Sequence, residues 1–132
     1  MFNLGTETLV SANINVLVTG SMGQLGSEIK ELSSNYNYNF FFTTRDDIDI
    51  TSKDSIKEFC QTNSINVIIN CAAYTAVDKA QSDIENADLV NRKAVKKLSI
   101  IAKELDIKLI HISTDYVFDG KNFKPYVEEF QT

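Results

Sequence analysis

Two groups of residues in this chain are candidates for binding or catalysis, and the first is a glycine-rich turn. Gly20, Gly23 and Gly26 follow a short apolar stretch, and apolar side chains then recur at helical spacing. A strand that turns through glycines into a helix lets its backbone approach a pyrophosphate, and the unpaired amides of the first helical turn point at the anion. This arrangement predicts a dinucleotide-binding turn.

The second group is a pair of hydroxyl residues, Ser113 and Thr114, which follow the last apolar stretch of the chain. Ligands and hydroxyl catalysts lie at the carboxyl ends of strands in open α/β sheets. His111, within the same stretch, is interpreted as a packed residue without a chemical role. The sequence has no zinc-ligand spacing, no nucleophile elbow and no P-loop lysine motif, so no metal is predicted.

Apolar strands and amphipathic helices alternate along the chain and must position these groups. The predicted strands cover about residues 14–19, 40–44, 67–72 and 109–113, and the predicted helices cover about residues 24–33, a segment after residue 51, and residues 84–105. Thr51 is the expected N-cap of the middle helix, with Asp54 completing a capping box. Buried strands that alternate with helices form parallel sheets. The predicted fold class is therefore α/β, a Rossmann-like doubly wound parallel sheet, truncated at about four strands and three helices.

The same pattern suggests how the chain is divided. Residues 1–13 form an N-terminal extension that is either a disordered tail or adds an edge strand at residues 8–10. We expect residues 14–132 to form an incomplete NAD(P)-binding Rossmann-like domain, with the substrate domain absent.

Composition narrows the class of protein further. The chain has 132 residues, 43% of them hydrophobic and 23% charged, with a net charge of −5 and a pI near 4.8. This balance suits one globular domain and argues against nucleic acid or a membrane surface as a partner. No signal peptide or spanning segment is apparent. Cys60 and Cys71 lack metal or redox spacing and are interpreted as reduced, buried thiols of a cytoplasmic protein.

The residues after the second predicted strand bear on the choice of cofactor. In dinucleotide-binding folds, a carboxylate at this point favours NAD, whereas an arginine accommodates the 2′-phosphate of NADP. The first charged residue here is Arg45, and Asp46 and Asp47 follow it. We expect NADPH, with NADH possible because of the two aspartates.

Five segments in order, GSMGQLG, NCAAYTAVDKAQSD, VNRKAV, STDYVFDG and PYVEE, together resemble the dTDP-4-dehydrorhamnose reductases. These enzymes are extended short-chain dehydrogenases/reductases, whose glycine motif is GxxGxxG, and the likeness covers residues 14–130. It implies NADPH-dependent reduction of dTDP-4-dehydro-L-rhamnose to dTDP-L-rhamnose, a step in nucleotide-sugar and cell-surface polysaccharide biosynthesis.

The resemblance also implies roles for particular residues. The residues implied for the pyrophosphate turn are Gly20, Met22, Gly23, Gln24, Leu25 and Gly26; those bordering the adenine are Asp49 and Ile50; those along the ribose and nicotinamide path are Ala72, Ala73, Tyr74 and Thr75; and further cofactor contacts are Asn91 and Ile112. Asn91 is equally well explained as a surface amide of its helix. Thr114 is implied as the catalytic hydroxyl and as a substrate contact, with Asp115 beside it touching the dTDP-sugar.

One departure from the family is decisive for activity. The family uses a tyrosine to protonate the developing alkoxide and a lysine four residues later to lower that tyrosine's pKa. None of the five tyrosines is followed by lysine at that distance. We therefore expect the amino-terminal portion of a reductase, inactive alone. Its predicted fourth strand, residues 109–113, is expected to have no strand on its outer side. Such a bare sheet edge favours self-association or a homodimer.

Two alternatives remain open from the sequence. A non-catalytic nucleotide-binding module, similar to the regulatory subunit of methionine adenosyltransferase, would share these motifs. A reductase acting on another 4-keto nucleotide sugar would share them as well.

Overall fold

The computed structural model of the chain describes residues 13–75, 82–113, 121, 124–125 and 127. The edge strand considered at residues 8–10 lies outside these ranges. So do two predicted site residues, Thr114 and Asp115.

The described strands form one parallel sheet. They are β1 (Asn15–Thr19), β2 (Asn39–Thr43), β3 (Val67–Asn70) and β4 (Lys108–His111). Their spatial order is β2-β1-β3-β4, and every neighbouring pair is parallel. The order reverses between β1 and β3, which makes the switch point where ligands bind in open α/β sheets. The predicted α/β fold class is confirmed.

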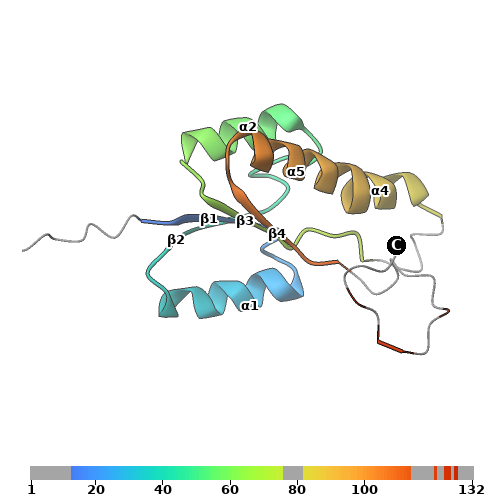
Figure 1. Cartoon of the computed structure of the whole chain (residues 1–132), viewed down its shortest axis with the longest axis horizontal. Coiled ribbons are helices and arrows are strands. Elements are labelled where there is room, and N and C mark those ends of the chain that lie inside the picture. The colour runs from blue at the N-terminus through green and yellow to red at the C-terminus, as the bar shows by residue number, and fades with distance from the viewer. Residues whose placement is uncertain (1–12, 76–81, 114–120, 122–123, 126, 128–132) are drawn as a thin grey trace, which may run out of the picture.

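Helices cover both faces of this sheet. They are α1 (Gln24–Leu32), α2 (Lys53–Thr62), α4 (Ile84–Asp88) and α5 (Val95–Glu104); a π-helical turn, η2 (Leu89–Ala94), joins α4 to α5, and a short 3₁₀ turn, η1 (Ser33–Asn35), follows α1. Figure 1 shows α2, α4 and α5 on one side of the sheet and α1 on the other. Within the described ranges, no helix is long and apolar enough to span a bilayer.

The hydrophobic core lies between the sheet and the α2–α5 layer. Successive residues of a strand point to opposite faces, so Leu17 and its partner Ile68 both face this layer and are fully buried. The buried members of this core are Leu17, Ile48, Ile56, Cys60, Ile65, Ile68, Leu98, Ile101, Ala102 and Ile107. Each large aliphatic side chain buried this way stabilises the fold by about 1.5–3 kcal/mol. This core holds the strand ends in place around the site described below.

The opposite face of the sheet is less completely covered. An apolar groove of about 400 Å³ runs beside α1, and it is lined by Ile14, Val16, Ile29, Leu32, Ser33, Tyr36, Tyr38, Phe40, Val67, Ile69 and Ile110. Ile110 is 49% exposed. In the described part of the chain, β4 pairs with β3 and forms an edge of the sheet.

Helix α2 begins one residue later than the capping pattern predicts. Ser52 is the N-cap, and its side chain accepts a hydrogen bond from the Ser55 amide at 3.3 Å. Thr51 instead donates its hydroxyl and its amide to the Asp49 carboxylate, at 2.6 and 2.8 Å. The Thr51 N-cap prediction is wrong because the upstream aspartate captures that side chain first.

The long helix predicted over residues 84–105 is present, but it is not a uniform α-helix. Its second turn, η2, has the wider spacing of a π-helix. Such turns are rare, and they occur frequently at functional sites. Here the wider turn carries Asn91, whose amide reaches the loop after β3.

Candidate functional site

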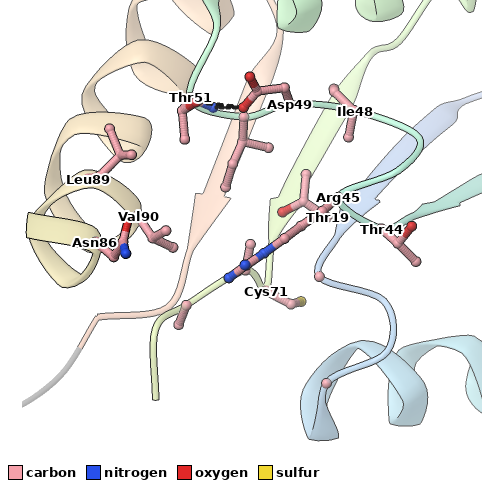
Figure 2. Close-up of a pocket in the computed structure, with 15 residues that line it drawn as sticks. Thr19, Thr44, Arg45, Ile48, Asp49, Thr51, Cys71, Asn86, Leu89 and Val90 are labelled. Carbon is pink, nitrogen blue, oxygen red and sulfur yellow. Dashed lines mark hydrogen bonds between the residues drawn. The ribbon is translucent and has the colours of Figure 1, made fainter. Parts of the chain in front are cut away.

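A cavity of about 520 Å³ opens at the carboxyl ends of β1, β2 and β3, beside α4 and η2 (Figure 2). Its size is typical of small-molecule and cofactor sites. The lining residues come from four segments: Thr19, Gly20 and Gly23; Thr44, Arg45, Ile48, Asp49, Ile50 and Thr51; Cys71, Ala72 and Ala73; and Asn86, Leu89 and Val90. The cavity therefore lies at the switch point of the sheet.

The glycine turn needs glycine at its two ends for different reasons. Gly20 has φ +66°, and a Cβ there would lie 2.6 Å from the Ala72 nitrogen. A Cβ on Gly26 would lie 2.5 Å from the Gly20 carbonyl oxygen. Gly20 thus lets β1 pass close to the loop after β3, and Gly26 lets α1 pack against the turn.

Helix α1 presents its amino end beside this turn. Gly23 is the N-cap, no side chain caps the helix, and its first turn carries no acidic residue. The first amides of an α-helix have no partner within the helix. Met22 and Leu25 are exposed here, at 83% and 41%. The amides without a partner inside the helix and the first turn without a carboxylate suit an anion at this end of α1.

The loop after β2 places the Arg45 side chain at the cavity, and within the same loop it engages the Asp47 carboxylate in hydrogen bonds. Arg45 lines the cavity, and Figure 2 shows its side chain extending into it. Asp47 accepts hydrogen bonds from the Thr44 amide and hydroxyl at 2.7 and 2.9 Å, and these bonds lower the pKa of the Asp47 carboxyl. The Asp47 carboxylate is therefore engaged within its own turn, whereas the Arg45 guanidinium faces the site.

The next part of this loop forms a second wall. Asp49 accepts both hydrogen bonds from Thr51 described above, and these bonds lower the pKa of its carboxyl. Ile48 is buried in the core, while Ile50 is half-buried at the cavity. The Lys97 ammonium donates to the Thr51 carbonyl, which ties this loop to α5. The wall thus offers an apolar surface with one anchored carboxylate.

The loop after β3 forms the opposite wall and is held by η2. Ala72 and Ala73 line the cavity with small side chains. The Tyr74 amide donates to Asn91 Oδ1 at 2.8 Å, and Asn91 Nδ2 donates to the Tyr74 carbonyl at 3.1 Å. One amide side chain therefore satisfies both backbone groups of Tyr74.

The Tyr74 side chain does not line the cavity. Its hydroxyl donates to Asp83 Oδ2 at 3.1 Å, at the start of α4. Desolvation, together with the Asp83 carboxylate, raises the pKa of the Tyr74 phenol. Tyr74 thus remains a neutral hydrogen-bond donor that joins its loop to α4.

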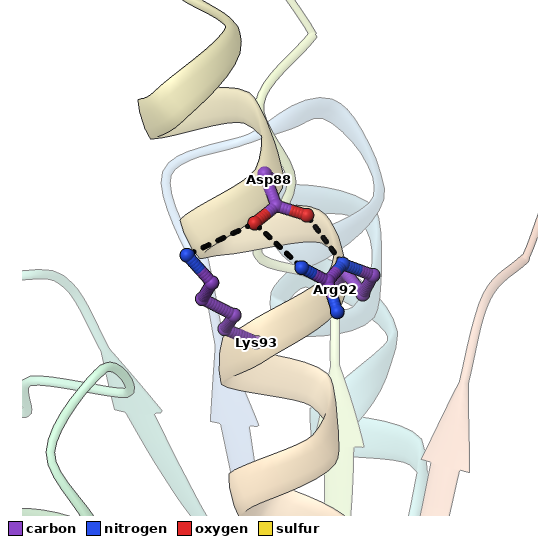
Figure 3. A network of polar contacts seen from close by, with 3 residues as sticks. All are labelled: Asp88, Arg92 and Lys93. Carbon is purple, nitrogen blue, oxygen red and sulfur yellow. Dashed lines mark hydrogen bonds and ion pairs between the residues drawn. The ribbon is translucent and has the colours of Figure 1, made fainter.

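An ion-pair cluster, shown in Figure 3, lies on the same helical segment. Asp88 pairs with Arg92 and, at 3.1 Å, with the Lys93 ammonium. Lys93 is five residues from Asp88, which is the hydrogen-bonding period of a π-helix. The two cations lower the pKa of the Asp88 carboxyl to about 2. Neither Arg92 nor Lys93 lines the cavity, so this cluster stabilises the helical segment at its surface.

The cavity gathers seven of the residues predicted to contact a cofactor: Gly20, Gly23, Arg45, Asp49, Ile50, Ala72 and Ala73. Other predicted contacts lie outside its lining: Met22, Gln24, Leu25, Gly26, Tyr74, Thr75, Asn91 and Ile112. Gly26, Tyr74 and Asn91 support the lining residues from behind, and Ile112 is exposed just after β4.

Sequence reasoning missed eight lining residues: Thr19, Thr44, Ile48, Thr51, Cys71, Asn86, Leu89 and Val90. Leu89 and Val90 follow the apolar period of their helix and resemble core residues. Thr19 could have been identified from its position as the last residue before the glycine turn. Cys60 is buried, but Cys71 is only half-buried, and both are free thiols. In the described ranges, no group of three or more His, Cys, Asp or Glu side chains is placed to hold a metal ion.

A parallel sheet with a glycine-lined cavity at its switch point defines a nucleotide-binding protein of the Rossmann type. The family model described as "RmlD substrate binding domain" matches residues 14–132. The chain belongs to this family.

Named relatives agree with this assignment. The chain is 40% identical over 114 residues to a dTDP-4-dehydrorhamnose reductase of Aggregatibacter actinomycetemcomitans, covering 86% of this chain and 39% of the relative. It is 37% identical over 116 residues to a dTDP-4-keto-6-deoxy-D-glucose reductase of Streptomyces niveus, covering 88% and 40%. The resemblance to the reductase family is confirmed, and the chain spans about two-fifths of the length of these relatives.

Solved structures agree as well. A dTDP-4-dehydrorhamnose reductase of Clostridium acetobutylicum superposes with a TM-score of 0.82 at 37% identity, covering 89% of this chain and 42% of that one. The Bacillus anthracis reductase, solved in complex with NADP, has a TM-score of 0.82 at 31% identity, covering 90% and 42%.

Proposed function

We propose that residues 14–132 are the cofactor-binding part of an NADPH-dependent reductase that converts dTDP-4-dehydro-L-rhamnose to dTDP-L-rhamnose. The observation that carries this proposal is the cavity at the switch point, with a glycine cradle that a Cβ would fill. The names of the relatives and the NADP complex of the Bacillus anthracis protein support it. NADPH, when bound, supplies the hydride for reduction of the 4-keto group.

The residues present fit a dinucleotide in the following way. The turn from Gly20 to Gly26 and the first amides of α1 would hold the pyrophosphate. The loop from Ile48 to Thr51 would border the adenine with its apolar surface. Ala72 and Ala73 leave room for a flat ring or a ribose to lie against the backbone, and Asn91 fixes that backbone through Tyr74.

We propose NADPH rather than NADH because of the loop after β2. Arg45 is the cation that faces the cavity, while the neighbouring Asp47 is bonded to Thr44. A guanidinium that faces the cavity suits the 2′-phosphate of NADPH, and the Asp47 carboxylate is engaged with Thr44. NADH remains the second cofactor to be tested.

The Arg45→Ala variant tests this preference. A hydrogen bond to a charged group contributes about 1.5–3 kcal/mol, so NADPH affinity should fall about 10- to 100-fold while NADH affinity stays within twofold. Arg92→Ala is the matched control, because that guanidinium pairs with Asp88 outside the cavity. An equal loss of NADPH and NADH affinity in Arg45→Ala would contradict the assignment.

Thr114 is proposed as the catalytic hydroxyl and Asp115 as its neighbour at the sugar. The printed 132 residues contain no tyrosine followed four positions later by lysine. We therefore propose that this chain binds NADPH without completing the reaction. NADPH fluorescence should report binding, whereas NADPH oxidation with dTDP-4-dehydro-L-rhamnose should not exceed the blank. Robust turnover by the 132-residue chain would refute this proposal.

A related substrate is the second candidate. The Streptomyces niveus reductase is named for dTDP-4-keto-6-deoxy-D-glucose, a different 4-keto nucleotide sugar from dTDP-4-dehydro-L-rhamnose, and the similarity to it favours this second candidate. A protein of family length should be assayed with both sugars. The ratio of their kcat/KM values decides between the two candidates.

We also propose a cellular setting and an association. Free thiols at Cys60 and Cys71 suit the reducing cytoplasm. The edge strand β4 and the partly exposed Ile110 suit pairing between two copies of this chain.

A further inference from the structure

A line of three polar side chains crosses the sheet at the carboxyl ends of β1, β3 and β4. The Thr19 hydroxyl donates to Asn70 Oδ1 at 2.6 Å, and Asn70 Nδ2 lies 3.1 Å from His111 Nδ1. Thr19 and Asn70 are 1% and 2% exposed, so neither can exchange its partner for water. His111 is the exposed end of the line, so its interpretation from the sequence as a packed residue is wrong.

This line lies directly beside the cavity. Thr19 lines it, and Asn70 precedes Cys71, Ala72 and Ala73, which line it too. The register pairs Thr19 with Asn70 and Asn70 with His111. The three side chains therefore join the ends of three strands at the level where the site opens.

The hydrogen bonds determine which nitrogen of His111 carries its proton. The Thr19 hydroxyl has a single proton, which it gives to Asn70 Oδ1. Asn70 Nδ2 has only protons to offer, so His111 Nδ1 must accept one. The ring is then neutral, with its own proton on Nε2.

We propose that His111 is a positioning residue. As a neutral ring protonated on Nε2, it holds the Asn70 amide in the orientation that accepts the Thr19 hydroxyl. It thereby keeps the ends of β1, β3 and β4 aligned beneath the cavity. The part of this inference that concerns cofactor binding rests on the proposed function.

A second proton on the ring would break this arrangement. It would place an N–H on Nδ1 against the Asn70 amide protons, and the amide could respond only by turning over. Its Nδ2 would then face the buried Thr19 hydroxyl, which would lose its acceptor. Protonation of the ring in acid should therefore open the line.

His111 is the one ionisable side chain of this three-residue line. Thr19 and Asn70 do not ionise, and β3, which packs against β4, carries no ionisable side chain. The charged residues of β4 and of α5, which also packs against β4, are Lys96, Lys97, Lys103, Glu104 and Lys108. Lys97 is bonded to Thr51, and Glu104 pairs with Lys57.

The tautomer can be measured directly, without cofactor. His111 is the single histidine of the chain, so selective ¹⁵N-histidine labelling of tag-free protein gives only two ring nitrogen signals. Long-range ¹H–¹⁵N correlation spectra above pH 7.5 should show the Nε2-protonated tautomer. In a second, uniformly ¹⁵N-labelled sample, the Asn70 side-chain amide signals should shift together with the ring on acidification. A ring protonated on Nδ1, or an Asn70 amide insensitive to the titration, would overturn the proposal.

Two variants link the tautomer to binding. His111→Asn places an amide oxygen near the position of Nδ1, whereas His111→Leu removes the acceptor. The ligand for this assay is NADP⁺, which is stable in acid. Its own titration affects the wild type and both variants equally, so it does not alter the comparison between them. Between pH 7.5 and 5.5, the affinity for NADP⁺ should fall about three- to tenfold more in the wild type than in either variant. At pH 7.5, His111→Leu should bind NADP⁺ more weakly than the wild type, and His111→Asn should bind it as well as the wild type.

The same pH profile in wild type and His111→Asn would overturn the link between the ring and binding. Absence of NADP⁺ binding in every protein would instead refute the proposed function. The NMR spectra would still decide the tautomer in that case.

Discussion

Replacing Asn91 by alanine tests whether the loop after β3 is held ready for a ligand. Asn91 makes two hydrogen bonds, at 2.8 and 3.1 Å, to the amide and carbonyl of Tyr74. Both disappear in the Asn91→Ala variant, and the cavity wall formed by Ala72 and Ala73 loses its support from η2.

The size of the effect follows from these two bonds. A net hydrogen bond contributes about 0.5–1.5 kcal/mol, and the exposure of Asn91 places each bond in the lower half of that range. Together they order the loop by about 1–2 kcal/mol. A ligand that needs the ordered loop must supply this free energy, so its Kd should rise about 5- to 30-fold.

The assay is a fluorescence titration with NADPH, accompanied by thermal unfolding of each protein. Asn37→Ala is the control, since Asn37 precedes β2 at the opposite end of the sheet. Asn91→Asp keeps the acceptor for the Tyr74 amide but opposes the Tyr74 carbonyl, so at neutral pH it should bind no better than Asn91→Ala. A folded Asn91→Ala variant that binds NADPH within twofold of wild type would show that Asn91 does not hold this loop ready for the ligand.

Three further predictions concern other parts of the chain. Gly26→Ala, whose Cβ would lie 2.5 Å from the Gly20 carbonyl oxygen, should lower the free energy of unfolding by about 1–3 kcal/mol and abolish NADPH binding; unchanged urea unfolding would contradict the close packing. The folded-state pKa of Asp88, about 2, lies below the ordinary aspartate value of 3.8, so this carboxylate stabilises the fold above about pH 4 and loses that effect as pH falls toward 2. Thermal melts should therefore show wild type more stable than Asp88→Asn at pH 6 and the difference shrinking below pH 4, whereas a constant difference would exclude the ion pairs as its cause. Ile110→Lys should shift the 132-residue chain toward a monomer in size-exclusion chromatography, and a wild type that is already monomeric would remove the proposed edge contact.

Much of the fold could be predicted because its signals are local. The apolar run around Leu17 and the glycines after it specify a strand, a turn and a helix within a few residues. The alternation of such units leads to a parallel sheet by the rules of chain connection. The boundaries differed by one or two residues where a neighbour competed, as Asp49 does for Thr51.

The candidate site could be predicted only in part. Leu89 and Val90 follow the same period as core residues, yet they line the cavity. The order of Arg45 and Asp47 in the sequence does not tell which of the two side chains faces the cofactor site. That depends on the turn in which Asp47 bonds to Thr44.

The succession of strands and helices along the chain, the glycine turn and the likeness to a reductase family could all be predicted from the residues alone. These properties depend on backbone sterics and on periodic burial, which act over a few neighbouring residues. The support of Tyr74 by Asn91, and the line of Thr19, Asn70 and His111 across three strands, could be found only in the folded chain. Those contacts join residues 17 to 51 positions apart, and their geometry exists only once the strands have paired.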